Sequence, residues 1–242
     1  MKLYKRLIEA SLRAALKDTP AVCVLGPRQA GKSTLVRMLE PDYAYVTFDD
    51  AAALAFARSD PTGFVAALPE RVILDEVQRV PDLLRTIKFS VDQDRRPGRF
   101  VLTGSANLML LPDLGDSLAG RMEVLQLQPL TAAEMERHPG RFLEVFMEGG
   151  LKPQVNPSKT AFFDTLASRI VSGGFPEAVA RTPTRARAWH RAYLRTLIER
   201  DVREVARVRD ASALSRLEPP RERRRLVGVS QAAIGISRCC CC

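Results

Sequence analysis

The chain has 242 residues, of which 46% are hydrophobic and 27% are charged, and its formal net charge is +9. These values are ordinary for a globular protein of one large or two small domains. The sequence has no run of 18 apolar residues and no apolar stretch of the signal-peptide type at its N-terminus, so it predicts a cytoplasmic protein with no membrane partner.

Residues 1–18 carry apolar side chains at helical spacing, which predicts an amphipathic helix packed beside the first strand and ended by Pro20. A buried strand over residues 22–25 follows, and a second helix is expected to begin at Lys32. Residues 21–39, which contain this strand, the loop of residues 26–31 and the start of this helix, are the stretch around which the rest of the chain is organised.

This loop and the two residues after it have the pattern G-x-x-x-x-G-K-[ST]. Its two glycines allow the backbone to come close to an anion, and the N-terminus of the following helix adds a positive dipole end. We expect Lys32 to reach the β- and γ-phosphates of a nucleotide and the Ser33 hydroxyl to bind Mg²⁺. The predicted nucleotide-binding residues are therefore Gly26, Pro27, Arg28, Gln29, Ala30, Gly31, Lys32, Ser33 and Thr34.

Two further strands end in acidic residues. The strand predicted over residues 43–48 is followed by Asp49 and Asp50, which lie near the site or cap the helix expected over residues 51–58. The apolar run RVILD, residues 71–75, is followed by Glu76. We expect Asp75 to hold Mg²⁺ through water and Glu76 to polarise the attacking water.

A helix is predicted over residues 81–91, and a strand over residues 100–103. The polar residues Thr103, Ser105 and Asn107 lie at or just beyond the end of this strand. One interpretation is that they hydrogen-bond the γ-phosphate or the attacking water, and the other is a polar turn without a ligand.

Arg121 directly precedes a fifth predicted strand, residues 122–127. It is a candidate to reach a γ-phosphate, either in its own site or in that of a neighbouring subunit, and the alternative is an ordinary surface arginine. Five apolar runs joined by helices predict the α/β class, with a parallel sheet covered by helices on both faces.

From residue 131 onward the pattern is helical, with helices expected over residues 131–147, 160–172 and 184–209 and a GGFPE turn before the last. This part is predicted to be a small helical lid or adaptor. From Pro219 the sequence has no sustained period and ends in four adjacent cysteines, Cys239–Cys242. Such a tail is usually disordered, and the alternative is a frameshift or premature stop.

The cysteines and the charges complete this picture. The spacing of the cysteines, Cys23 and the four terminal ones, supports neither a zinc site nor a disulfide framework.

Residues 181–225 contain 14 arginines and six acidic residues, a local net charge of +8. The excess predicts a possible DNA contact, and the alternative is a solvated helix with ion pairs four residues apart. The predicted domains are residues 1–130, 131–217 and 218–242.

Several stretches together resemble a known family: GPRQAGKSTL, VILDEVQRVPDLL, DRRPGRFVLTGSANLMLLP, SLAGRMEVLQLQPL and GGFPEA. They are similar to uncharacterised prokaryotic ATPases of the AAA+ superfamily that carry a DUF-type domain after the ATPase module. The resemblance covers about residues 4–217 and implies a P-loop NTPase core with sheet order 5-1-4-3-2, a helical lid, and ATP and Mg²⁺ as cofactors.

By motif position, the resemblance also assigns roles to single residues. It implies that Lys32 and Ser33 belong to the Walker A motif and that Asp75 and Glu76 form the Walker B pair. The first sensor would be Thr103, Ser105 or Asn107, and Arg121 would be the arginine finger.

These observations together predict an ATPase that hydrolyses Mg·ATP and couples its nucleotide state to lid movement and to a partner or DNA, with possible self-association. A nucleotide-gated binding module without turnover is an alternative, and Glu76 discriminates against it because a pure switch needs no base. A P-loop small-molecule kinase is a third and weaker reading.

Overall fold

A computed structural model describes residues 3–105, 120–138, 142–150 and 159–197. The chain divides into two compact units, Met1–Ala192 and Tyr193–Cys242, and all the described strands belong to the first. The domain boundaries predicted at residues 130 and 217 stay predictions. The end of the helix predicted over residues 184–209 and the unpatterned tail lie outside the described residues.

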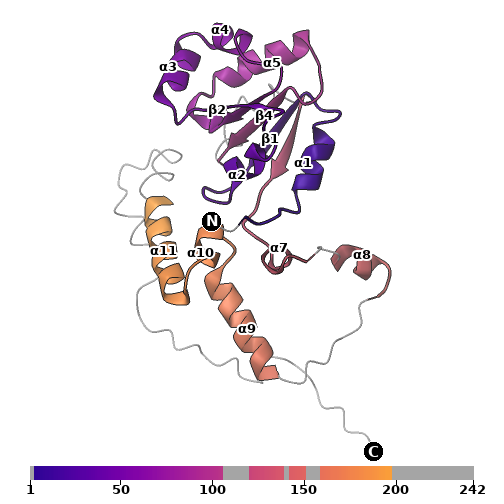
Figure 1. The fold of residues 1–242 in the computed structure, drawn as a ribbon, viewed down its shortest axis with the longest axis vertical. Helices are drawn as coiled ribbons and strands as arrows, with labels where there is room; N and C mark the ends of the chain where they lie inside the picture. The colour runs from indigo at the N-terminus through magenta and orange to yellow at the C-terminus, as the bar shows by residue number, and fades with distance from the viewer. Residues whose placement is uncertain (1–2, 106–119, 139–141, 151–158, 198–242) are drawn as a thin grey trace, which may run out of the picture. The chain divides into compact units, whose positions relative to one another are not determined.

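The centre of the first unit is a five-stranded parallel sheet (Figure 1). The strand order is β2-β3-β4-β1-β5, which confirms the predicted order 5-1-4-3-2 read from the other edge. The strands all point the same way, so their carboxyl ends lie at one edge of the sheet. Their bounds are β1 Ala21–Leu25, β2 Ala44–Thr47, β3 Val72–Asp75, β4 Phe100–Gly104 and β5 Met122–Gln126.

Helices cover both faces of this sheet, as the sequence predicts. β1 is therefore buried on both sides, and its residues alternate between two cores. One core contains Cys23 and side chains of α3 (Ala51–Ser59), α4 (Pro61–Ala66) and α5 (Leu83–Gln93). The other contains Val24 and side chains of α1 (Glu9–Ala15) and α2 (Lys32–Arg37). Figure 1 shows α3, α4 and α5 together on one side of the strands and α1 on the other.

Local capping explains why two of these helices begin where they do. The Asp50 carboxylate accepts hydrogen bonds from the backbone N–H groups of Ala52 and Ala53 at the start of α3, at 3.2 and 3.4 Å. The Asp60 carboxylate accepts from the Gly63 N–H at 2.8 Å, and Pro61 is the first residue of α4. The sequence analysis did not predict α4, whose signal is this Asp-Pro pair.

The N-terminal helix is shorter than predicted. It begins at Glu9, whereas the apolar period continues back to Leu3. Leu3 and Leu7 are 58% and 47% exposed, so the first part of the period is not buried. Residues 3–6 have no helical structure, and this segment brings Arg6 to the functional site.

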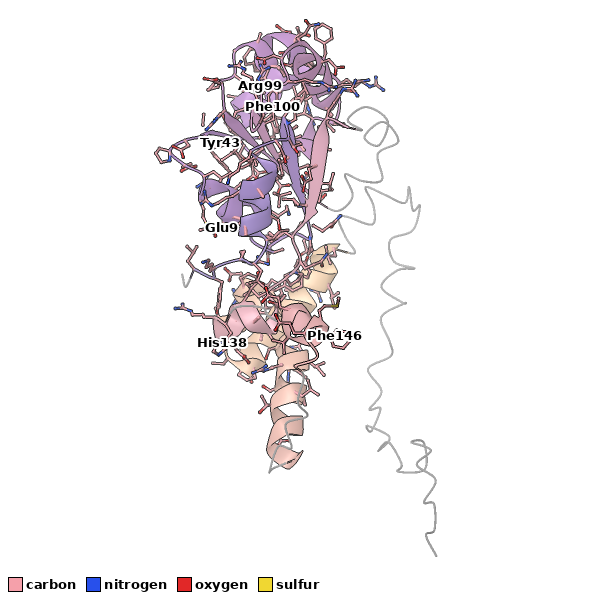
Figure 2. The ribbon with its side chains drawn as sticks, turned by 90° about the vertical axis from the view of Figure 1, so that its right-hand side faces the viewer. Glu9, Tyr43, Arg99, Phe100, His138 and Phe146 are labelled. Atoms are coloured by element: carbon pink, nitrogen blue, oxygen red, sulfur yellow. The ribbon has the colours of Figure 1, made fainter. Side chains whose placement is uncertain are left out.

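The amino edge of the sheet is closed by side chains that Figure 2 labels. The Tyr43 hydroxyl donates to the Gly98 carbonyl at 2.8 Å, and Phe100 is fully buried at the start of β4. Gly98 has a φ of +66°, and a Cβ there would lie 2.6 Å from the Leu16 carbonyl oxygen. This edge is therefore tightly packed, and the polar loops lie at the opposite edge.

The helices after the sheet are α7 (Ala132–Glu136), α8 (Phe142–Met147), α9 (Lys159–Ser172), α10 (Pro176–Val179) and α11 (Pro183–Thr196). The single helix predicted over residues 131–147 is wrong, because α7 ends at Arg137, which adopts a left-handed conformation with φ of 60°. In the part of the chain that the structure describes, no helix combines the length and the apolar character needed to cross a membrane.

Candidate functional site

The predicted phosphate-binding loop joins β1 to α2 at the carboxyl edge of the sheet. Gln29 and Gly31 have left-handed backbones, with φ of 61° and 97°. A Cβ at Gly26 would lie 2.2 Å from the Leu127 carbonyl oxygen, so the loop packs directly on the chain that leaves β5. Only glycine fits this contact, and the backbone forms a cradle suited to an anion.

Lys32 lies inside this loop and is only 5% exposed. Its Nζ donates to the carbonyls of Gly26 and Pro27 at 3.1 and 3.2 Å. Burial lowers the pKa of Lys32, while the carboxylates of Glu76 and Asp75 act to raise it. The ammonium group is thus held at the loop, within the field of both acidic residues that were predicted to work with it.

A cavity of about 410 Å³ opens beside the loop. Small-molecule sites have volumes of roughly 300–1,000 Å³, so this cavity is of the right size for a ligand. Six of the nine predicted nucleotide-binding residues line it: Gln29, Ala30, Gly31, Lys32, Ser33 and Thr34. Among the other lining residues are Tyr4, Glu76, Leu130, Pro176, Glu177, Arg181 and Trp189.

A second cavity of about 440 Å³ also contains Ser33, beside Asp75 and the threonines at positions 34 and 47. Hydroxyl and carboxylate oxygens are the ligands that Mg²⁺ prefers, and Mg²⁺ usually takes only one or two from the protein. Within the described ranges, no group of three or more histidine, cysteine, aspartate or glutamate residues could hold a metal. Ser33 and Asp75 line the same cavity and carry oxygen atoms of this kind, so their chemistry suits Mg²⁺.

Asp75 is buried at the end of β3 with both carboxylate oxygens engaged. Oδ1 accepts a hydrogen bond from the Thr103 hydroxyl, and Oδ2 accepts one from the Tyr45 hydroxyl at 2.5 Å. Burial raises the pKa of Tyr45, and its bond to Asp75 raises it further. Sequence reasoning missed Tyr45, whose only signal is that β2 lies beside β3.

Thr103 connects the two predicted Walker B residues. Its Oγ1 donates to Asp75 and accepts the backbone N–H of Glu76 at 3.1 Å. Glu76 itself has a left-handed backbone, with φ of 63° and ψ of 43°, and its carboxylate accepts a hydrogen bond from Gln78. Such a conformation costs energy for a residue other than glycine and is enriched at functional sites.

Four other residues that were predicted at or near the site have different outcomes. Ser105 is buried just beyond β4, where its backbone N–H donates to Gln78 Oε1 at 3.2 Å. Asn107 lies outside the described residues. Asp49 and Asp50 were predicted either to lie near the site or to cap a helix. Asp49 lines the second cavity, whereas Asp50 caps α3.

Arg121 lies at the amino edge of the sheet, directly before β5. Its Nε donates to Asp92 Oδ1 at 2.5 Å, and this bond raises the pKa of Arg121. The phosphate-binding loop follows the carboxyl end of the neighbouring β1. Arg121 is therefore not brought to the loop of its own chain, and the role in a neighbouring subunit stays a prediction.

Arg6 is a site residue that sequence reasoning missed. It is 7% exposed, and its guanidinium donates to the Ala30 carbonyl in the loop at 2.8 Å and to the Gln128 carbonyl at 2.6 Å. The same group forms an ion pair with Glu134 in α7. No local pattern marks such a residue, although the Thr131-x-x-Glu134 capping box does mark the start of α7.

The GGFPE turn supplies the facing part of the first cavity. The Leu130 N–H donates to the Gly174 carbonyl at 2.7 Å, and a Cβ at Gly174 would lie 2.3 Å from the Leu130 carbonyl oxygen. The rings of Phe175 and Trp189 have centroids 5.3 Å apart, which ties the turn to α11. This packing fixes the turn, whose Pro176 lines the cavity together with Trp189.

Comparison with known families agrees with this geometry. Residues 18–136 match the family described as an AAA domain (AAA_14), and residues 163–218 match a domain of unknown function (DUF8612). The uncharacterized proteins Rv2008c of Mycobacterium tuberculosis and Mb2031c of Mycobacterium bovis are each 33% identical to this chain over 210 residues. The match covers 85% of this chain and 41% of each relative, so the chain spans about two fifths of the length of the curated relatives it matches.

Two solved structures are also similar. The Walker-type ATPase PABY2304 of Pyrococcus abyssi is 18% identical with a TM-score of 0.47, over 85% of this chain and 76% of that chain. A RuvB variant from Thermotoga maritima is 20% identical with a TM-score of 0.35, over 54% of this chain and 47% of that chain. The match of residues 18–136 to the AAA domain family agrees with the parallel sheet and the phosphate-binding loop, which have the arrangement of the P-loop NTPase fold.

Proposed function

We propose that this chain binds Mg²⁺·ATP at the loop of residues 26–34 and hydrolyses it. The observation that carries the proposal is the gathering of Lys32 with the adjacent pair Asp75 and Glu76 at one edge of the sheet, on two segments more than 40 positions apart. A loop that cradles phosphate needs only the first of these. An acidic pair beside it adds a metal ligand and a base, which a hydrolase requires.

In this proposal the Glu76 carboxylate takes a proton from a water molecule whose oxygen attacks the γ-phosphorus. The bond from that phosphorus to the β,γ-bridging oxygen breaks, and the products are ADP and inorganic phosphate. Lys32 leaves the carbonyls of Gly26 and Pro27 to compensate the phosphate charge. Ser33 and Asp75 would hold Mg²⁺, which would supply positive charge beside the phosphates.

Trp189 offers a direct readout of nucleotide binding. It is the single tryptophan of the chain, and it lines the cavity together with Pro176. We propose that the nucleoside part of ATP occupies this end of the cavity, where an aromatic ring and a proline offer apolar surface. Its fluorescence is then expected to change when ATP binds.

The decisive experiment compares phosphate release and Trp189 fluorescence in the wild type, Lys32→Ala and Glu76→Gln. We expect Lys32→Ala to weaken ATP binding about ten- to a hundredfold, the range for losing a charge-assisted bond. Glu76→Gln is expected to retain ATP affinity within about twofold and to lose roughly 10²–10⁴ in turnover. The control is Glu123→Gln, which removes an exposed carboxylate on β5.

The other outcomes distinguish the alternative functions. Binding without phosphate release in the wild type would favour the nucleotide-gated module. Transfer of the γ-phosphoryl group to a metabolite in place of water would favour a kinase. Equal ATP affinity in the wild type and Lys32→Ala would reject the site altogether.

Nucleotide state is proposed to reach the lid through the contact of Leu130 with Gly174. Leu130 follows β5 and lines the cavity, and Gly174 lies two residues before Pro176 and Glu177, which also line it. A ligand between these walls would act on both. Self-association is part of the same proposal, because only a neighbouring subunit could bring an Arg121 to the loop.

A DNA contact is a second proposal, and the observation that favours it is the arginine face of α11. Arg185, Arg187 and Arg191 are exposed, and the 14 residues of this helix include no aspartate or glutamate. At 100° per residue these arginines fall on one side, opposite the buried Ala186. A guanidinium group can donate two parallel hydrogen bonds to the oxygens of one phosphate, which suits a nucleic-acid backbone.

Duplex binding measured at several salt concentrations tests this contact. We expect the slope of log affinity against log salt to become shallower by about 1 for each of Arg187→Gln and Arg191→Gln. The control is Arg95→Gln with Arg96→Gln, two arginines that form ion pairs with nearby acids. The absence of binding at low salt would reject the proposal.

A further inference from the structure

The side-chain amide of Gln78 lies between the proposed base and the end of β4. Its Nε2 donates to Glu76 Oε2, and its Oε1 accepts the Ser105 N–H at 3.2 Å. A carboxylate can only accept a hydrogen bond and a backbone N–H can only donate one. These two partners therefore fix which way the amide of Gln78 points, and reversing it would break both bonds.

A tight turn explains why Gln78 reaches back to the residue two positions before it. Glu76 is left-handed, and a short 3₁₀ helix, η1 (Val77–Arg79), begins immediately after it. The Arg79 N–H donates to the Glu76 carbonyl at 3.1 Å, while Val77 is fully buried and Val80 nearly so. With the turn anchored on both sides, the backbone holds Gln78 beside the Glu76 carboxylate.

Glu76 is consequently tied to β4 twice. Its backbone N–H donates to Thr103 Oγ1, and its side chain is linked through Gln78 to the N–H of Ser105. Thr103 and Ser105 stand on either side of Gly104, the last residue of the strand. A displacement of this strand end would thus be passed to both the backbone and the carboxylate of Glu76.

We propose that Gln78 is a positioning residue that holds the Glu76 carboxylate in register with the end of β4. The proposal rests on the hydrolytic function given above. Gln78 donates to Oε2 of the carboxylate, so this bond does not occupy Oε1, which we assign to accept the proton of the attacking water. By this route the polar end of β4, which was predicted to sense the γ-phosphate, is coupled to the base.

Two variants and a control separate the parts of this bridge. Gln78→Met retains the length of the side chain and removes both bonds, whereas Gln78→Glu can still accept from Ser105 but places a like charge beside Glu76. The matched control is Gln93→Met, because Gln93 is an exposed glutamine at the end of α5.

At saturating Mg·ATP we expect Gln78→Met to lower kcat about ten- to a hundredfold, the range for one hydrogen bond to a charged group. Gln78→Glu is expected to lose at least as much. In both variants KM should stay within about twofold, because the phosphate-binding loop is unchanged. A merely structural role would change KM and kcat together or lower the stability alone.

A second measurement does not depend on turnover. In a double-mutant cycle of Gln78→Met and Glu76→Leu, followed by urea unfolding without nucleotide, we expect a coupling of about fivefold in the unfolding constant. No coupling, or wild-type kcat in Gln78→Met, would overturn the proposal. If the cycle shows coupling but the wild-type chain releases no phosphate, the bridge is supported and the hydrolytic function is rejected.

Discussion

Arg6 and Glu134 form a buried ion pair, with Arg6 Nε 3.0 Å from Glu134 Oε1 and side chains that are only 7% and 4% exposed. The pair joins the segment before α1 to the first helix after the sheet. Because the same guanidinium donates to the Ala30 carbonyl, it also contacts the phosphate-binding loop. One cation therefore fixes three parts of the chain that are far apart in sequence.

Removing either partner should destabilise the fold strongly, because the other charge would remain buried and unpaired. We expect Arg6→Met and Glu134→Met each to cost about 3–5 kcal/mol in the free energy of unfolding, measured by urea denaturation. The double variant should cost much less than the sum. Arg13→Met, which removes an exposed pair with Glu9, is the control and should cost under about 0.5 kcal/mol. Additive losses in the double variant would contradict this account.

The same pair predicts a pH dependence of stability. Burial acts to raise the pKa of Glu134, but the N–H groups of Thr131 and Leu7 and the Arg6 guanidinium outweigh it, so the pKa lies below its ordinary 4.5. The unfolded chain then binds the proton more readily, and stability falls as the pH drops below about 4.5 and through the folded-state pKa. In Glu134→Gln the part of this loss of stability at low pH that comes from protonation of Glu134 should disappear. An unchanged acid profile would contradict the prediction.

Lys32 predicts a pH dependence of ATP affinity. Burial lowers the pKa of Lys32 from its ordinary 10.5, and only the protonated amine attracts phosphate. Affinity, read from Trp189 fluorescence, should therefore begin to fall before the pH reaches 10.5. In Lys32→Met the affinity should be lower throughout and should lack this alkaline fall. A wild-type affinity that stays constant up to pH 10.5 would show that the proton is retained.

Cys23 should be chemically inert in the folded chain. Burial raises the pKa of its thiol from 9.0 to about 12, which lowers the thiolate population roughly a thousandfold at a given pH. In a variant with Cys239–Cys242 replaced by serine, iodoacetamide at pH 8 should label Cys23 only after urea is added. Mass spectrometry of the peptide measures this, and rapid labelling of the native chain would contradict the burial of β1.

The parts of the site that the sequence predicted are those with a local signature. The loop after β1 is marked by two glycines and a lysine at fixed spacing, and Asp75 and Glu76 by an apolar run that ends in acids. The strand order followed from the family resemblance. The signals of the loop and of the acidic pair each lie within about ten residues, so the local sequence pattern is enough to find them.

The residues that were missed depend on contacts between distant segments. Arg6 and Glu134 are 128 positions apart. The apolar period around Arg6 favours a helix there, but α1 begins only at Glu9. Gln78 was missed for another reason, because its role needs both the left-handed turn at Glu76 and the arrival of β4 beside it. No propensity of a single residue predicts either arrangement.

The position of Arg121 leads to a test by mixing. Arg121 precedes β5, which runs for five residues, roughly 16 Å, toward the edge that bears the loop. Its ion pair with Asp92 holds it at the amino edge, and the bond to Arg121 lowers the pKa of Asp92. This position predicts that any contact between Arg121 and a nucleotide is made in a neighbouring subunit.

We therefore expect Arg121→Ala and Glu76→Gln each to bind ATP but to release little phosphate alone. When the two variants are mixed, some interfaces combine an intact Glu76 with an intact Arg121 from the neighbour, and turnover should reappear. In the control mixture of Glu76→Gln with Lys32→Ala,Arg121→Ala, no interface has Lys32, Glu76 and Arg121 all intact, so it should stay inactive. Full activity of Arg121→Ala alone would remove the arginine from catalysis. An inactive first mixture would show that Arg121 and Glu76 must come from the same chain, which the position of β5 argues against.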